Sequence, residues 1–187
     1  MSTDAPHPRG PHLPGWRLLM WGGAAALLLL PLIAMQFTDE VNWTPFDFAV
    51  FGILLALACG ACELAVRMSR GNRLYRVGAF LAVATGFLLV WANLAVGFVG
   101  SETNPYNLWY AGVLAIGVTG ALIARFRPRG MAAALTATAL AQAAVGLVAQ
   151  FGGMEHPWPA TLLFTGLWWV SAMLFHAAGR YGARTLP

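Results

Sequence analysis

Long apolar runs separated by short polar links dominate the sequence. A helix needs about 20 apolar residues to cross a hydrocarbon core of ~30 Å. Six runs satisfy this length: 18–36, 46–66, 77–100, 107–124, 131–151 and 160–178. The short links force neighbouring helices to be antiparallel, and the alternating strands of about ten residues found in membrane barrels are absent. The pattern predicts an all-α polytopic membrane protein with six transmembrane helices in three antiparallel hairpins.

The ends of the chain differ from these runs. Residues 1–17 are rich in Pro and Gly, which predicts a flexible tail, and residues 180–187 form a second short tail. The run 18–36 is longer than the 7–15 apolar residues typical of a signal peptide, and no small-residue cleavage site follows it. We therefore expect the first helix to be retained and the bundle to span 18–179.

Composition supports a membrane setting, since 59% of the residues are hydrophobic and only 10% are charged. Soluble domains carry about 25% charged residues. The predicted partner is therefore the lipid bilayer, alone or within a homo-oligomer or a larger membrane complex. The chain has no nucleophile elbow, phosphate loop or Walker signature, so the sequence gives no reason to expect an enzyme.

The charges are unevenly distributed along the chain. The eleven basic residues are all arginines, against seven acids, for a net charge of +4. On a soluble protein this balance would suggest nucleic-acid binding. Here the arginines all fall on one side of the predicted spans: Arg9, Arg17, Arg67, Arg70, Arg73, Arg76, Arg125, Arg127, Arg129, Arg180 and Arg184. Arginine-rich links face the cytoplasm, so we predict that both termini are cytoplasmic and that no nucleic acid is bound.

Three links on the opposite, outer side share a pattern. Each contains a proline, then Asp47, Asn107 or Thr161 two residues later, and a glycine seven residues after the proline. Asp, Asn and Thr can cap the first turn of a helix, so one physical constraint on three hairpins explains the pattern. The alternative is a true threefold repeat around a shared outer vestibule.

Candidate ligand-binding residues gather in and below these outer links. They are Asp39, Glu40, Asn93, Glu102, Asn104, Glu155 and His156. Oxygen ligands with one imidazole could hold a divalent cation, although no metal-binding spacing is present and the metal is unknown. In the alternative interpretation, the acids stand where arginine is disfavoured, and Asn93 forms an interhelical hydrogen bond.

Three features inside the spans have two interpretations each. Glu63 is either an intramembrane proton or cation relay or the partner of Arg67 one turn later. The Cys59 and Cys62 thiols form a CxxC, which indicates either redox chemistry or small buried side chains. His176 has no second histidine at similar depth, so we expect no haem and no other cofactor.

One segment resembles a known kind of protein. Residues 91–107 (WANLAVGFVGSETNPYN) resemble small, uncharacterised bacterial membrane proteins, and residues 123–131 and 36–43 extend the resemblance less clearly. That resemblance implies the bacterial inner membrane and brings no activity to any residue.

The leading functional hypothesis is the binding or passage of a small solute or cation beneath the acidic outer links. The first alternative is a non-catalytic structural or accessory subunit of a larger membrane complex. A third is a membrane redox carrier.

Overall fold

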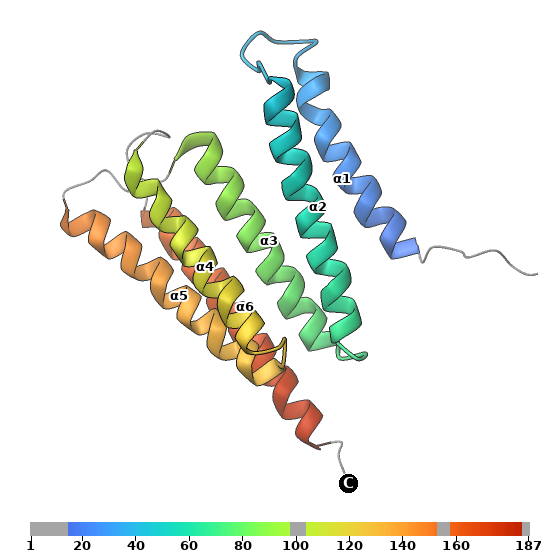
Figure 1. Cartoon of the computed structure of the whole chain (residues 1–187), viewed down its shortest axis with the longest axis vertical. Helices are drawn as coiled ribbons and strands as arrows, with labels where there is room; N and C mark the ends of the chain where they lie inside the picture. Colours follow the sequence, from blue (N-terminus) through green and yellow to red (C-terminus); the bar gives the residue numbers. More distant parts are fainter. Residues whose placement is uncertain (1–14, 98–103, 153–157, 185–187) are drawn as a thin grey trace, which may run out of the picture. The chain divides into compact units, whose positions relative to one another are not determined.

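The computed structural model of the chain describes residues 15–97, 104–152 and 158–184, which are helices joined by short turns. The elements are α1 (Gly15–Ala34), α2 (Pro45–Met68), α3 (Arg73–Val96), the 3-10 helix η1 (Pro105–Leu108), α4 (Trp109–Ile123), α5 (Pro128–Phe151) and α6 (Trp158–Arg184) (Figure 1). Within the described residues, six helices are long and apolar enough to cross a membrane, α4 together with η1. This confirms the predicted all-α fold and identifies a polytopic membrane protein.

Several helix ends differ from the prediction. α3 begins at Arg73 rather than at residue 77, because the Asn72 side chain caps its first turn by accepting a 3.1 Å hydrogen bond from the Tyr75 N–H. α6 continues to Arg184, through part of the stretch that we expected to be a tail. The first turn before α4 is a 3-10 helix, which starts at Pro105.

In two of the three predicted repeat links, the cap that the structure describes stands before the proline, not after it. The Thr44 hydroxyl accepts from the Asp47 N–H at 3.4 Å, and the Asp47 carboxylate accepts from the Thr44 N–H at 2.7 Å. The Asn104 side chain caps η1. Asn107 lies inside η1 and Thr161 inside α6, and both are buried. The expectation that Asp47, Asn107 and Thr161 are the caps was therefore wrong, because proline favours the first helical position and the cap precedes it.

The chain divides into two compact units, Met1–Cys59 and Gly60–Pro187. In the first unit, α1 buries none of its residues. The turn between α1 and α2 is closed by Trp43, whose ring packs edge to face on Phe48 and Phe51 at centroid distances of 5.3 and 5.4 Å. Aromatic packing thus fixes the start of α2.

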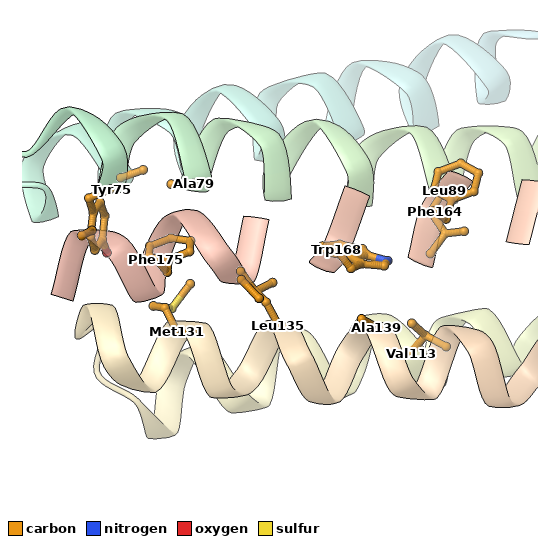
Figure 2. Packing of buried hydrophobic residues seen from close by; sticks show 14 of the residues in the cluster. Tyr75, Ala79, Leu89, Val113, Met131, Leu135, Ala139, Phe164, Trp168 and Phe175 are labelled. Atoms are coloured by element: carbon orange, nitrogen blue, oxygen red, sulfur yellow. The ribbon is translucent and has the colours of Figure 1, made fainter. Parts of the chain in front are cut away.

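The second unit has a continuous core among α3, α4, α5 and α6. α5 packs against both α4 and α6, and α6 packs against α3, whereas α3 and α4 touch only slightly. Figure 2 shows the core residues that line these contacts: Tyr75, Ala79, Leu89, Val113, Met131, Leu135, Ala139, Phe164, Trp168 and Phe175. The main neighbour of α3 is therefore α6, which is distant in sequence.

Small residues allow the helices of this unit to approach closely. A Cβ atom placed on Gly120 of α4 would lie 2.7 Å from the Cβ of Ala134 on α5. A Cβ atom on Gly78 of α3 would lie 3.1 Å from the Cβ of Leu174 on α6. The Ser171 hydroxyl also donates a 2.6 Å hydrogen bond to the Gly78 carbonyl. Close approach and interhelical hydrogen bonds are the main source of helix association in lipid.

Candidate functional site

The predicted outer residues are only partly within the described residues. Glu102, Glu155 and His156 lie outside them. Asp39 and Glu40 are exposed and belong to the first unit, where the Glu40 N–H donates to the Thr38 hydroxyl at 3.2 Å. Among the residues that the structure describes, no group of three or more His, Cys, Asp or Glu side chains could hold a metal ion.

Asn93 and Asn104 have local structural contacts in the second unit. The Asn93 amide nitrogen donates to the Asn107 carbonyl at 3.4 Å, which joins α3 to η1. The Asn104 side chain accepts from the Tyr106 N–H at 3.1 Å. The Asn93 contact is the interhelical hydrogen bond of the alternative interpretation.

The features predicted inside the spans also have described surroundings. Glu63 lies 3.7 Å from Arg67, one turn further along α2, and only the arginine side chain is well exposed. On the same helix, Cys59 is buried and Cys62 is half-buried. His176 on α6 is exposed. The ion pair is the contact expected from the structural interpretation of Glu63.

The sequence analysis missed a group of buried polar atoms between α5 and α6. Gln142 is 1% exposed and Trp168 is 4% exposed. The Gln142 Oε1, the Trp168 Nε1 and the Thr165 Oγ1 are buried and have no hydrogen-bond partner among the described residues. We call these three residues the polar core group. It combines an acceptor, a donor and a hydroxyl that can act as either.

Two contacts fix the register of α5 against α6. Near one end, a Cβ atom on Gly179 would lie 3.1 Å from the Arg129 Cγ. Near the other end, the Trp158 indole N–H donates to Gln150 Oε1 at 2.8 Å. Between these points the two antiparallel helices advance equally, about 1.5 Å per residue. Gln142 therefore lies level with the turn of α6 that carries Thr165 and Trp168.

Trp168 also connects this level to the other two helices of the unit. A Cβ atom on Gly86 of α3 would lie 3.5 Å from the indole Cη2 of Trp168 and 3.6 Å from Leu114 of α4. Figure 2 shows the Trp168 ring within the core, beyond Leu135 and towards Val113. The absence of a side chain at Gly86 leaves room for the indole.

The buried hydroxyls of Thr85, Thr138 and Ser171 in the same core are hydrogen bonded. The Thr138 hydroxyl donates to the Ala134 carbonyl at 2.9 Å, and the Thr85 hydroxyl donates to the Leu81 carbonyl at 2.7 Å. Ser171 bonds across to α3. An unpaired buried polar atom costs about 1–3 kcal/mol. The polar core group therefore differs from these three hydroxyls, and its unpaired buried atoms need an explanation.

A signal for this group was present in the sequence. Gln142 is an isolated amide in the middle of an alanine-rich span, and polar residues within a span are candidate functional residues. That Thr165 and Trp168 lie at the same level could not be predicted, because it depends on the packing of α5 on α6.

A second feature lies at one end of the same unit, where a groove of about 1410 Å³ opens between three segments of the chain. They are the α2–α3 turn, the α4–α5 turn and the end of α6. Five exposed arginines line it: Arg70, Arg73, Arg125, Arg127 and Arg129. We call it the arginine groove. The structure thus brings together arginines from two links that were predicted to share one side of the membrane.

A comparison of the chain with protein-family models, with curated proteins and with solved structures finds no match. The comparisons identify no family.

Proposed function

We propose that this polytopic membrane protein binds a small, uncharged polar solute in the core of its second unit. The observation that carries the proposal is the polar core group. Gln142, Thr165 and Trp168 present three buried polar atoms without protein partners at one level of α5 and α6. Solute sites in membrane proteins are commonly formed by inward-facing polar groups near the middle of the spans.

A bound solute would replace the hydrogen bonds to water that Gln142 and Trp168 lose on burial. A buried amide or indole loses its hydrogen bonds to water on folding, and lipid supplies no replacement. A guest that carries both a donor and an acceptor would satisfy Gln142 and Trp168 together. A bound water molecule could satisfy them as well. Binding of an added solute therefore distinguishes a functional site from a hydrated structural one.

The chemistry of the group favours a neutral guest. Its three members are an amide, a hydroxyl and an indole, and none of them carries a charge. Glu63, an acid in the second half of α2, lies 3.7 Å from Arg67. Passage of a cation past the outer residues is a separate prediction, which concerns the acids Asp39, Glu40, Glu102 and Glu155 and the imidazole of His156.

Thermal unfolding of the purified protein tests this function. Glycerol, urea and glucose serve as probes, because each is small, neutral and carries donors and acceptors. A ligand that binds the folded state stabilises it by RT ln(1 + [L]/Kd), or about 2.7 kcal/mol at 100 Kd. We expect at least one probe to raise the unfolding midpoint of the wild type, and Gln142→Leu to lose this increment.

A matched variant controls for general effects of the probes, since polyols stabilise most proteins and urea destabilises them. Gln36→Leu makes the same chemical change in the first unit, where the exposed Gln36 side chain, in the turn after α1, donates to the Leu32 carbonyl of α1 at 3.4 Å. The unfolding midpoint of Gln36→Leu should change with each probe as the midpoint of the wild type does. Equal responses of all three proteins to every probe would contradict the proposed solute site.

A further inference from the structure

The arginine groove stands apart from the polar core group, and its charge and shape favour a different kind of ligand. We propose that it binds the phosphate headgroup of an anionic phospholipid. The groove lies at the ends of spanning helices, where headgroups meet the protein. This proposal concerns another site than the proposed function and does not depend on it.

Charge is the first argument. The five lining arginines are exposed, and none has an ion-pair or side-chain hydrogen-bond partner among the side chains that the structure describes. By contrast, Arg67 lies beside Glu63, and Arg76 donates to the Ser69 hydroxyl at 2.9 Å. Guanidinium groups bind phosphate oxygens in a bidentate manner, so uncompensated arginines around one groove suit an anionic phosphate ligand.

The groove is held in shape by hydrogen bonds between its segments. The buried Tyr75 hydroxyl donates to the Phe126 carbonyl at 2.9 Å and ties the α4–α5 turn to the start of α3. The Asn72 amide donates to the Ala178 carbonyl at 3.2 Å and ties α6 to the same place. Tyr75 also packs edge to face on Phe175 at 4.8 Å. The arginines therefore lie on and beside turns that these contacts hold in place against α3 and α6.

The backbone of these turns is itself unusual. Arg70, Arg125 and Phe126 have φ values of 47°, 49° and 57°. Left-handed conformations at residues other than glycine are uncommon and cost free energy, so tertiary contacts must hold them in place. In the α4–α5 turn, the hydrogen bond to the Phe126 carbonyl supplies such a contact. Two of the arginines thus project from turns with a defined conformation.

The start of α5 adds backbone donors to the groove. Arg127 is the N-cap residue of α5, and its side chain makes no capping hydrogen bond. The first intrahelical bond runs from the Met131 N–H to the Arg127 carbonyl at 2.9 Å. The N–H groups of Arg129 and Gly130 precede that bond, so they have no acceptor within the helix. Amides at a helix start favour phosphate, and here they accompany the arginines.

The apolar part of the lining favours a lipid over a soluble phosphate. Met68, Leu74, Phe126 and Tyr181 line the groove together with the arginines. Apolar side chains offer nothing to a free phosphate ion, whereas they can contact the glycerol and upper acyl chains of a lipid. Basic pockets between transmembrane helices bind anionic headgroups by this combination.

Native mass spectrometry of the full chain tests the proposal. The protein is extracted into micelles that contain equal amounts of phosphatidylglycerol and phosphatidylcholine, and retained lipids are identified by mass. The groove variant is the triple substitution Arg125→Gln, Arg127→Gln and Arg129→Gln. We expect the wild type to retain phosphatidylglycerol preferentially and the groove variant to retain it at least tenfold less.

A matched variant separates the groove from basic charge in general. Arg17→Gln, Arg67→Gln and Arg180→Gln remove the same charge from residues that do not line the groove. This control should retain phosphatidylglycerol as the wild type does. An equal loss in both variants would overturn the proposal, and so would equal retention of the two lipids by the wild type.

A second arm identifies the source of the phosphate. The unfolding midpoint is measured with added phosphatidylglycerol and, separately, with sodium phosphate at matched ionic strength. We expect the lipid to raise the midpoint of the wild type and inorganic phosphate to leave it unchanged. Stabilisation by inorganic phosphate without stabilisation by the lipid would overturn the assignment to a phospholipid.

A triple Arg→Lys variant at positions 125, 127 and 129 keeps the charge of the groove. It should bind less phosphatidylglycerol than the wild type, because lysine lacks the bidentate geometry.

Discussion

α1 and α5 have nearly the same mean hydropathy and similar lengths, yet they differ completely in burial. α1 buries none of its residues, whereas α5 buries nine, among them Leu135, Thr138 and Gln142. The difference lies in the neighbours. Ala134 of α5 closely approaches Gly120 of α4, and the other side of α5 packs against α6. Hydropathy therefore identifies a span, and the pairing of small residues between helices determines which span forms the core.

The largest expected effect comes from filling the closest helix contact. Gly120→Leu places a side chain where even a Cβ atom would lie 2.7 Å from the Ala134 Cβ, so α4 and α5 must separate. We expect a loss of about 3 kcal/mol in the free energy of unfolding. Equilibrium unfolding in mixed detergent micelles measures it.

The same substitution in α1 is the control. A Cβ atom on Gly22 would meet nothing within 4 Å, so Gly22→Leu should change the unfolding free energy by less than about 0.5 kcal/mol. If Gly22→Leu destabilised the protein as much as Gly120→Leu does, the contrast between α1 and α5 would be wrong.

The next effect comes from leucine truncation in the two helices. Leu135→Ala removes a side chain that is 4% exposed, and it should leave a cavity that costs about 2 kcal/mol. Leu29 of α1 is 51% exposed, so lipid can fill the space that Leu29→Ala leaves, and little change is expected. Equilibrium unfolding in mixed detergent micelles compares the two variants directly. Similar losses would show that α1 is as tightly packed as α5.

A smaller effect is expected from one interhelical hydrogen bond. Ser171→Ala removes the bond from α6 to the Gly78 carbonyl of α3 and should cost about 1 kcal/mol. Thr136 of α5 donates to the Ala132 carbonyl of its own helix at 2.9 Å, so Thr136→Val should cost less. A loss at Thr136 that exceeds the loss at Ser171 would contradict the role of bonds between helices.

The smallest effect has the opposite sign. Gln142→Leu replaces a buried amide, whose Oε1 has no protein partner, with an apolar side chain of similar size. We expect the unfolding free energy to stay equal or to rise by up to about 1 kcal/mol in the absence of added solute. A clear destabilisation, again measured by equilibrium unfolding, would indicate that Gln142 has a structural role instead of a binding role. Functional sites commonly reduce stability in this way.

The spans were predictable because each hydrocarbon crossing requires a long apolar run, and six such runs are visible in the sequence. The start of α3 was predicted too late, because Arg73 and Arg76 were assigned to a loop. Their guanidinium groups lie at a helix start whose cap is Asn72. Treating these charges as part of a loop therefore placed the start of the helix four residues too late.

The two proposed binding features depend on tertiary structure to different degrees. The arginines of the groove were visible as a charge bias, but the bonds from Tyr75 to Phe126 and from Asn72 to Ala178 show how separate segments form one groove. The polar core group was harder to foresee. Gln142, Thr165 and Trp168 come from two helices, and only the register of α5 against α6 brings them to one level.

The central claim is that the core centred on α5 binds a small polar solute while α1 contributes no buried residue. Native mass spectrometry of protein extracted gently from cells that express the wild type or Gln142→Leu tests it most directly. The account predicts a small, non-lipid mass bound to the wild type and absent from Gln142→Leu. Spectra that show the same bound masses for both proteins, or a stable partner protein and no small molecule, would contradict it and favour an accessory subunit.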